Sequence, residues 1–506
     1  MKKFFTLIAA LVMSVGAFAT NYTDTIDVFV YGQHFPQSAT IGLDQNEDGT
    51  YNFSLKNFMF SMGAQTMPVG NVNLKNVQGI TANGTTMLSA DQNTRIQDGD
   101  DPSVTTWMGS FLPTVPVHLV AEQSGDRLYA VIDINLTGVG VIKVVFGDGY
   151  QIPNSGFENF HTAKYGTVTS DEPNAWHSFQ TASGSLAMFA NAVHNYKSAN
   201  AHSGSYSAKL VATNAVITIA NGTMTTGRMN AGSITASDPA NHAALDMSVT
   251  DKDGNGDPYY VVMNGQPDSL AVWVKYGQAT PQAAHPYATV SAIITDGTYY
   301  QDPEDKSYAN KLAEARDRTI AATNDQWKRV SIPFDYIDRS VNGKAILVTI
   351  STNADAGQGS EGDSILVDDI SLIYNPVKAT AITVKGDAVE DFEAGKTVTL
   401  TKTYTDLTAD DIVVTTDNDN AKVFKTLDED NGTTTVTVKV ASNDLNDIAT
   451  YTLKVPTTTG ISNVAVDTDN TTAEYYNLAG QRVGTPQPGQ VYIMKKGGKA
   501  VKVVNR

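Results

Sequence analysis

The sequence predicts an all-β protein built from several modules in series. Short runs in which apolar and polar residues alternate recur along the chain, and turn segments such as NEDGT and SGDR separate them. A helical pattern is convincing only in SYANKLAEARDRTIAAT, at 307–323, which we expect to be an excursion between strands. A length of 506 residues suggests about three domains.

Residues 1–19 have the pattern of a secretory signal peptide. Lys2 and Lys3 precede an apolar run that is too short to span a bilayer, and Ala17-Phe18-Ala19 is a small-residue cleavage site. We therefore expect an exported protein of the periplasm, the cell surface or the extracellular space, without a transmembrane segment.

The net charge limits the kinds of partner, and the cysteine content limits how the fold is stabilised. The formal net charge is −18, and an acidic chain repels nucleic acid and anionic lipid. The chain has no cysteine, so its cores must be large enough to hold without disulfides.

Residues 20–149 predict a barrel. About eight short alternating runs, among them TIDVFVYG, YNFSLKNFMF and RLYAVIDINL, are typical of an up-and-down meander, and closure into a barrel removes exposed edges. The segment resembles the calycin-like β-barrel domain of secreted Bacteroidetes proteins. The resemblance rests on Asn57-Phe58, Pro68-Val69-Gly70-Asn71, Trp107-Met108-Gly109 and Ile142…Phe146-Gly147.

Residues 150–375 predict a two-sheet jelly roll with long loops. The segment resembles the carbohydrate metabolism domain of Bacteroidetes, a jelly roll like that of carbohydrate-binding modules. The matching residues are Asn154-x-Gly156-Phe157-Glu158, Trp176, His202-Ser203-Gly204-Ser205-Tyr206, Gly222…Gly227-Arg228, Val274-Lys275-Tyr276, Ser351-Thr352, Trp327 and Val367-Asp368-Asp369-Ile370. The resemblance implies glycan binding or processing and supplies no catalytic residue.

Residues 376–457 have the rhythm of an immunoglobulin-like sandwich, with acidic turns such as TDNDN and LDEDNG between the strands. Residues 458–506 comprise a linker and a locally basic β tail. The tail resembles the C-terminal domain that the type IX secretion system reads, through Tyr475-Tyr476-Asn477-Leu478, Gly480-Gln481, Val483 and Gly489-x-Val491-Tyr492-Ile493. The alternative is a plain terminal β-hairpin that packs on the domain before it.

Glu158 and Asp368 are the leading metal candidates, because related jelly rolls use acids at these positions to hold a structural calcium. Alternation places Asp368 on one face with Leu366, Ile370 and Leu372, and Asp369 on the other. Calcium prefers carboxylate and carbonyl oxygens. The alternative is that Asp368 accepts backbone N–H bonds without a metal.

Other metal motifs are incomplete. Asp251, Asp253, Asn255 and Asp257 have the spacing of an EF-hand start, and Asp44, Asn46 and Asp48 are similar, yet the twelfth positions are Val262 and Leu55. Both segments are typical of acidic β-turns. The eight histidines show neither H-x-H nor H-E-x-x-H spacing, so the sequence does not indicate a zinc site.

Aromatic rings bind sugars by stacking on pyranose faces. Five aromatic residues lie in or beside predicted loops. These ligand candidates are Trp176, Tyr259, Tyr260, Tyr299 and Tyr300. For Trp176 a core role is as well supported as a binding role, whereas Trp273 and Trp327 are expected in the core.

The sequence thus favours a non-catalytic glycan-binding protein of the cell surface, with a polysaccharide and the secretion machinery as partners. No nucleophile elbow, thiol nucleophile or phosphate loop is present. Two alternatives stay open: a glycan-active hydrolase with a carboxylate pair about 5–9 Å apart, and a structural or adhesive protein without a sugar site. The barrel is also a candidate for binding a small apolar ligand.

Overall fold

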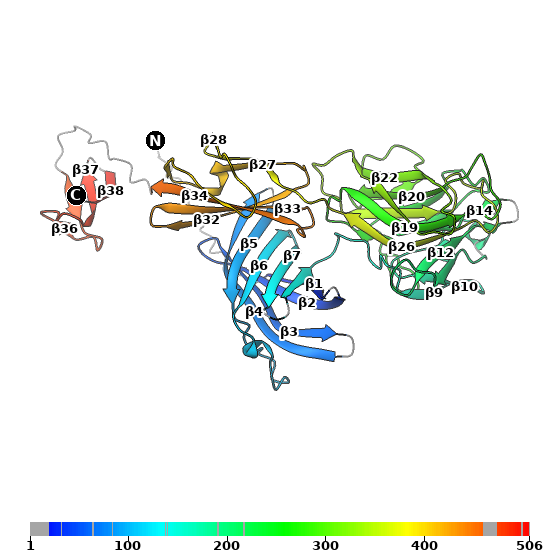
Figure 1. Ribbon diagram of the computed structural model, residues 1–506, viewed down its shortest axis with the longest axis horizontal. Coiled ribbons are helices and arrows are strands. Elements are labelled where there is room, and N and C mark those ends of the chain that lie inside the picture. The colour runs from blue at the N-terminus through cyan, green and yellow to red at the C-terminus, as the bar shows by residue number, and fades with distance from the viewer. Residues whose placement is uncertain are drawn as a thin grey trace, which may run out of the picture. The chain divides into compact units, whose positions relative to one another are not determined.

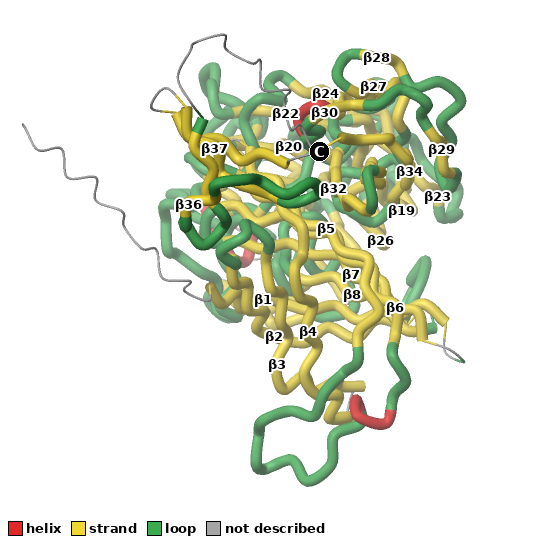
Figure 2. Tube along the Cα trace, turned by 90° about the vertical axis from the view of Figure 1, so that its left-hand side faces the viewer, coloured by secondary structure: helices red, strands yellow, loops and turns green. Residues whose placement is uncertain are grey.

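The structure is a computed structural model that describes residues 20–504 except 32, 63–64, 83, 137, 139, 190–191, 216–217, 459–472 and 497–498. The expected signal peptide and most of the expected linker lie outside the described residues. Strands and loops account for nearly all of the described chain, with helix limited to single turns (Figure 2). The all-β prediction is confirmed. Within these residues no helix is long and apolar enough to cross a membrane.

The N-terminal segment forms a closed barrel of eight antiparallel strands (Figure 1). Each strand pairs with the next along the chain, and pairing of the first strand with the last closes the barrel. The strands are β1 (Thr20–Val30), β2 (Gln33–Gln45), β3 (Tyr51–Met62), β4 (Gln65–Ala82), β5 (Thr85–Thr94), β6 (Val115–Ser124), β7 (Arg127–Leu136) and β8 (Gly140–Phe146).

Inward-facing apolar side chains fill the barrel. Ile26, Ile41, Leu88, Leu119 and Phe146 are fully buried and belong to one apolar cluster. Removing such side chains from water is the main stabilising contribution, at about 25 cal/mol per Å² of apolar surface.

Several of the residues that carry the barrel resemblance, among them Asn57, Gly70 and Asn71, meet at one place. Asn57 donates its backbone N–H to Asn71 Oδ1 (2.7 Å), and Asn57 Oδ1 accepts the N–H of Asp100 (2.6 Å). Gly70 has a φ of +121°, and a Cβ there would lie 2.1 Å from the carbonyl oxygen of Gln97. The motif therefore fastens the loop between β5 and β6, which carries the turn η1 (Gly109–Phe111), onto β3 and β4.

The second segment is a sandwich of two main antiparallel sheets. One has the order β11-β12-β26-β19-β23 and the other β15-β25-β20-β22-β24, with β18 also paired to β25. The main strands are β11 (Asn195–Ser198), β12 (Ser207–Val211), β15 (Thr223–Thr225), β18 (Val261–Val262), β19 (Ser269–Gly277), β20 (Ala288–Thr295), β22 (Lys311–Ile320), β23 (Lys328–Pro333), β24 (Asp335–Tyr336), β25 (Ala345–Ser351) and β26 (Ser364–Ile373).

Smaller sheets and turns flank the sandwich. The two-stranded pair β9-β10 and the sheet β16-β17-β21 carry much of the candidate site. These flanking elements are β9 (Phe160–Tyr165), β10 (Val168–Pro173), η2 (Phe179–Thr181), η3 (Ala187–Phe189), β13 (Thr213–Asn214), β14 (Ile219–Ala220), β16 (Arg228–Ala231), β17 (Asn241–Leu245) and β21 (Tyr300–Asp302).

The expected helix at 307–323 is wrong, because its central residues form β22. This strand pairs with β20 on one side and β24 on the other. A register shift opposite Ile294 and Thr295 lets the adjacent Leu312 and Ala313 both be buried, which hides the alternation. Charged residues at Glu314 and Arg316 lie between buried positions and pair with each other. Sheet pairing thus overrides a helix-prone composition.

The third segment has two sheets, β28-β27-β31 and β29-β34-β33-β32, with β30 paired to β34. The strands are β27 (Ala379–Val384), β28 (Asp387–Ala388), β29 (Thr397–Thr399), β30 (Tyr404–Thr405), β31 (Ile412–Thr416), β32 (Lys422–Asp430), β33 (Thr433–Ala441) and β34 (Ile448–Thr458), and η4 is Ala409–Asp411. The expected acidic turn LDEDNG is wrong in part, because residues 427–430 end β32 and only Asn431 and Gly432 form the turn.

The tail forms a sheet of its own with the order β36-β35-β37-β38. Its strands are β35 (Glu474–Tyr476), β36 (Arg482–Val483), β37 (Val491–Lys496) and β38 (Lys499–Val504). By compactness the chain divides into two units: one holds the barrel, the sandwich and segments 414–426 and 438–450, and the other holds the remaining third segment and the tail.

Candidate functional site

Three of the predicted ligand residues line one hollow on the sandwich. Tyr259 and Tyr260 come from the loop before β18, and Tyr299 directly precedes β21. The hollow, which we call the tyrosine pocket, has a volume of about 380 Å³ and is also lined by Ser183, Arg228, Asn230, His242, Ala244, Leu245, Asp246, Val249 and Asp251. Tyr299 is 41% exposed, so its ring is accessible to a ligand.

The other two predicted ligand residues lie in the interior. Trp176 is fully buried in the sandwich core, with its ring centroid 5.3 Å from that of Phe157. Tyr300 is fully buried as well, and its hydroxyl donates to Glu304 (3.0 Å). Neither ring offers a face to a ligand. A tandem pair on a strand points to opposite sides, which explains why Tyr299 is exposed and Tyr300 is not.

A larger groove adjoins the tyrosine pocket at Asn230 and His242, which line both. This sheet groove has a volume of about 720 Å³ and crosses one face of the β15-β25-β20-β22 sheet. Its floor is polar, formed by Thr223, Thr289, Ser291, Arg316, Arg318, Thr349 and Ser351.

Three of the four acids that line these hollows are engaged by basic side chains, and the fourth, Asp246, accepts from the N–H and the hydroxyl of Ser248. Asp302 accepts from Arg316 (2.9 Å), Asp355 accepts from Arg318 (2.9 Å), and Asp251 pairs with Arg228. A hydrogen bond from His285 lowers the pKa of Asp355 and outweighs its slight burial. Such pairing favours the ionised carboxylate, whereas a general acid needs a raised pKa.

Asp368 is fully buried, but simple alternation does not describe its strand. Asp369 has a φ of +45°, and the pairing of β26 with β19 is irregular opposite Ala271 and Trp273. Ile365 and Val367 therefore share the core with Ile370 and Leu372, although their positions differ in parity. The expectation that Asp368 shares its face with Ile370 and Leu372 is wrong, because a bulge reverses the alternation between them.

Both candidate calcium ligands accept hydrogen bonds from one loop. Asp368 Oδ2 accepts the N–H of His202 (2.7 Å) and of Ser203 (3.3 Å). Glu158 Oε1 accepts the N–H of Ser205 (2.8 Å) and of Tyr206 (3.2 Å). The alternative without metal thus describes these contacts, with donors from the 202–206 loop rather than the first strand. Calcium at Glu158 and Asp368 stays a prediction.

Asp369 completes this arrangement. Its Oδ2 contacts His202 Nδ1 (2.6 Å), and the imidazole stacks on Trp273 at 3.7 Å between ring centroids. Burial, together with the neighbouring charge of Asp369, raises the pKa of Asp368 to about 6.

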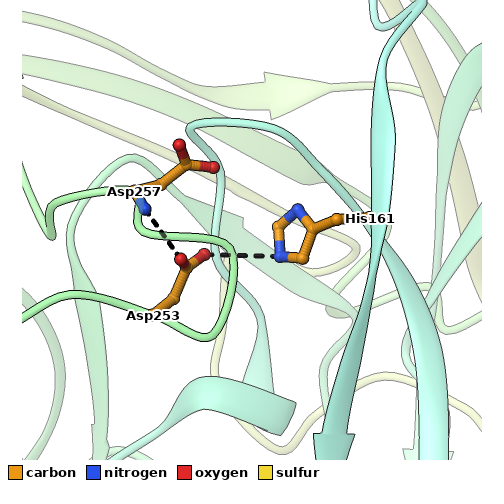
Figure 3. Close-up of side chains that lie close together, drawn as sticks. All are labelled: His161, Asp253 and Asp257. Carbon is orange, nitrogen blue, oxygen red and sulfur yellow. Dashed lines mark hydrogen bonds and ion pairs between the residues drawn. The ribbon is translucent and has the colours of Figure 1, made fainter.

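A second cluster joins residues that the sequence does not associate. His161 and Glu172 are directly opposite each other in the β9-β10 pair, so their side chains share one face. His177 follows β10, and Asp253 and Asp257 belong to the acidic loop 251–257, which approaches His161 (Figure 3). Asp253 Oδ2 lies 3.3 Å from His161 Nε2 and 3.5 Å from His177 Nδ1. Glu172 Oε2 lies 3.7 Å from His161 Nε2.

This cluster is electrostatically unusual. The side chains of Glu172, His177 and Asp253 are completely buried, and that of His161 is 11% exposed. Burial raises the pKa of Glu172 to about 7, despite hydrogen bonds from Ser178. Burial also lowers the pKa of His177, which favours the neutral imidazole. The sequence offered one signal for the cluster: a hairpin centred near Gly166 pairs His161 with Glu172. Asp253 lies too far along the chain for any spacing rule to include it.

A comparison with known families decides the nature of the N-terminal barrel. Residues 18–148 match the family model described as "Calycin-like beta-barrel domain". This segment is a calycin-like barrel. The predicted resemblance is confirmed there. No curated protein matches the chain.

Two solved structures from Bacteroides show weak similarity. One is described as a "putative glycoside hydrolase" from Bacteroides thetaiotaomicron, with 13% identity, a TM-score of 0.32, and coverage of 52% of this chain and 86% of that chain. The other is described as a "putative outer membrane protein" from Bacteroides fragilis, with 11% identity, a TM-score of 0.19, and coverage of 66% and 96%. TM-scores this low do not establish a common fold, so these names describe those proteins and not this chain.

Proposed function

We propose that the sandwich binds a glycan in the tyrosine pocket, with the sheet groove as its continuation. The observation that carries this proposal is the convergence of Tyr259, Tyr260 and Tyr299 in one hollow from two separate loops. Ligand sites combine apolar or aromatic walls with a few polar groups that fix orientation. A sugar ring presents C–H faces to the tyrosines and hydroxyls to the polar lining.

The polar lining suits a neutral or weakly charged sugar. Arg228 lies over the ring of Tyr259 at 4.7 Å and also pairs with Asp251. The hydroxyl of Tyr299 donates to Gln301 (2.9 Å). Asn230 and His242 add donors and acceptors where the pocket meets the groove. Together these groups offer both hydrogen-bond donors and acceptors without a dominant charge.

Recognition is better supported than hydrolysis. Glycoside hydrolysis needs one carboxyl group that stays protonated near neutral pH and a second that is ionised. Asp251, Asp302 and Asp355 each pair with an arginine, and a hydrogen bond from His285 lowers the pKa of Asp355. The aromatic lining likewise speaks against a purely structural protein.

A glycan array probed with the full mature chain tests the proposal. We expect binding to a defined set of poly- or oligosaccharides, and a loss of affinity of about 10-fold or more in Tyr259→Ala and in Tyr299→Ala. Tyr287→Ala is the matched control, because Tyr287 is 40% exposed on the same sandwich and does not line either hollow. Silence across plant, host and microbial glycans, or unchanged binding by both pocket variants, would contradict the proposal.

We also propose that the protein acts at the cell surface and that the tail sheet addresses it to a secretion machinery. The support is the predicted signal peptide and the tail motifs, which form the separate sheet β36-β35-β37-β38. Deletion of residues 474–506 is expected to remove the protein from the surface fraction while leaving it exported. Unchanged surface display would contradict the sorting role.

A further inference from the structure

We infer that His161, Glu172, His177 and Asp253 form a site for one zinc ion beside the tyrosine pocket, where the ring of His177 lies 4.5 Å from that of Tyr259 between centroids. The first support is a set of four unpaired atoms. His161 Nε2, Glu172 Oε2, His177 Nδ1 and Asp253 Oδ2 are buried, and none has a hydrogen-bond partner among the described residues. Leaving one buried polar atom without a partner costs about 1–3 kcal/mol, so four in one place need a common explanation.

The second support is the way each imidazole is held. His161 Nδ1 lies 3.1 Å from Asn174 Oδ1, and His177 Nε2 lies 3.2 Å from the carbonyl oxygen of Pro258. Both partners are acceptors in this assignment, so these ring nitrogens carry the protons. The opposite nitrogen of each ring then faces the cluster. Metal-ligating histidines are oriented in this way by their second nitrogen.

The carboxylates follow the same rule. Glu172 Oε1 accepts the N–H of Ser178 (2.6 Å) and its hydroxyl. Asp253 Oδ1 accepts the N–H groups of Asn255 (2.9 Å) and Asp257 (2.8 Å). In each residue one oxygen is fixed by donors and the other faces the two histidines. Each of the four side chains thus has one acceptor atom that faces another member of the cluster.

The spacing of the acceptors fits a small tetrahedral ion. Zinc bonds to nitrogen and oxygen are about 2.0–2.1 Å long, so two ligand atoms of a tetrahedron lie about 3.3–3.4 Å apart. Three of the six separations among the four atoms are 3.3, 3.5 and 3.7 Å. Glu172, His177 and Asp253 form a group whose ligand atoms all lie within 4.8 Å of one another, and His161 joins it through Asp253 and Glu172. Calcium and magnesium prefer six or more oxygen ligands, and two imidazoles are foreign to them. Two imidazoles with two carboxylates suit zinc.

Charge and enclosure give the ion a structural role. Two carboxylates neutralise a divalent cation, which removes the cost of burying either charge alone. Four protein ligands with almost no exposure leave no open position for a substrate. The ion would fasten the β9-β10 pair, the turn at His177 and the acidic loop 251–257 to one another.

Zinc binding by the full mature chain tests this inference. The protein is stripped with a chelator and then titrated with zinc alone, with bound metal measured by mass spectrometry. We expect one zinc per chain and a rise in Tm of about 5–10 °C at 100-fold excess over Kd. Cobalt is expected to give the visible spectrum of a tetrahedral site, and millimolar calcium is expected to leave the Tm unchanged.

Variants separate the site from adventitious binding. Glu172→Gln and His161→Ala are expected to weaken zinc binding at least about 100-fold. Asp171→Asn, at the exposed position beside Glu172 in β10, and His118→Ala, an exposed histidine of the barrel, are expected to bind as the parent does. Circular dichroism verifies that each variant folds. The inference fails if the parent binds no zinc, if zinc does not change the Tm, or if a folded Glu172→Gln binds zinc as well as the parent.

Discussion

Two acidic clusters of the same sandwich differ in the groups that face their carboxylates. Around Glu158 and Asp368, backbone N–H groups of one loop point at the carboxylates. Around Glu172 and Asp253, the facing atoms are imidazole nitrogens and other carboxylate oxygens, all of them acceptors. In the second cluster backbone N–H groups reach only one oxygen of each carboxylate, and the other oxygen, which faces the histidines, has no hydrogen-bond donor among the described residues. Residue type alone therefore does not identify a cation site; the direction of the surrounding donors does.

The largest effect that separates the clusters is expected from Asp368→Ala. The change removes the acceptor of the N–H groups of His202, Ser203 and Asp369, all beside a fully buried position. We expect a loss of roughly 3 kcal/mol in the free energy of unfolding, measured with urea. Asp325→Ala is the control, since Asp325 is 87% exposed and should contribute little. A loss below about 1 kcal/mol would show that the loop does not depend on this carboxylate.

The next effect concerns a residue that only orients a zinc ligand. Asn174→Ala removes the acceptor of His161 Nδ1 and leaves all four proposed ligands in place. We expect zinc affinity to fall about 10–100-fold without loss of stoichiometry, as is usual for such partners. Competition with a coloured chelator measures the affinity. An unchanged affinity would mean that the ring of His161 needs no support from Asn174.

The pH dependence of stability is a smaller effect of the first cluster. Because the pKa of Asp368 is raised to about 6 in the fold, the protonated form is the one that folding favours. Its contribution to stability is complete below about pH 4 and is lost as the pH rises through 6. Urea unfolding of Asp368→Asn from pH 4 to pH 7 is expected to show a flatter profile than the parent. Parallel profiles would contradict the assignment.

The smallest effect is expected in the second cluster without metal. Glu172→Gln keeps an oxygen that can accept from Ser178 and replaces the buried Oε2, which has no hydrogen-bond donor among the described residues, by an amide nitrogen. We expect the metal-free variant to unfold within about 1 kcal/mol of the metal-free parent. This small loss in the free energy of unfolding contrasts with the loss of roughly 3 kcal/mol expected for Asp368→Ala. A large loss in both variants would show that the two clusters are alike.

The sequence predicted the regular strands better than it predicted the register shift in β22 and the bulge in β26. Alternation and turn chemistry sufficed for the barrel and the sandwich, since each strand there has a period of two. The prediction failed where a register shift brings Leu312 and Ala313 together and where Asp369 forms a bulge. Both features place one extra residue on a strand, and no local pattern records which partner strand requires it.

For the candidate sites as well, the sequence indicated residues that have a local pattern but not residues that only the fold brings together. Tyr259, Tyr260 and Tyr299 were identifiable because exposed aromatics near acidic turns have a local signature. Whether such a ring is accessible depends on the whole sandwich, which buries Trp176 and Tyr300. The histidine cluster could not be found from spacing, because His161 and Asp253 belong to segments that only the folded sandwich brings together.

The β9-β10 pair gives the chain a cross-link that needs no sulfur. Two strands alone are marginal in water, and this pair belongs to neither main sheet. With no cysteine in the sequence, a disulfide is not available to hold it. An ion shared by His161, Glu172, His177 and Asp253 would serve the same purpose, and oxidation or reduction would not break it, because zinc has no redox chemistry. The cost is a dependence on available zinc: where chelators compete for the ion, we expect the β9-β10 pair to lose this cross-link.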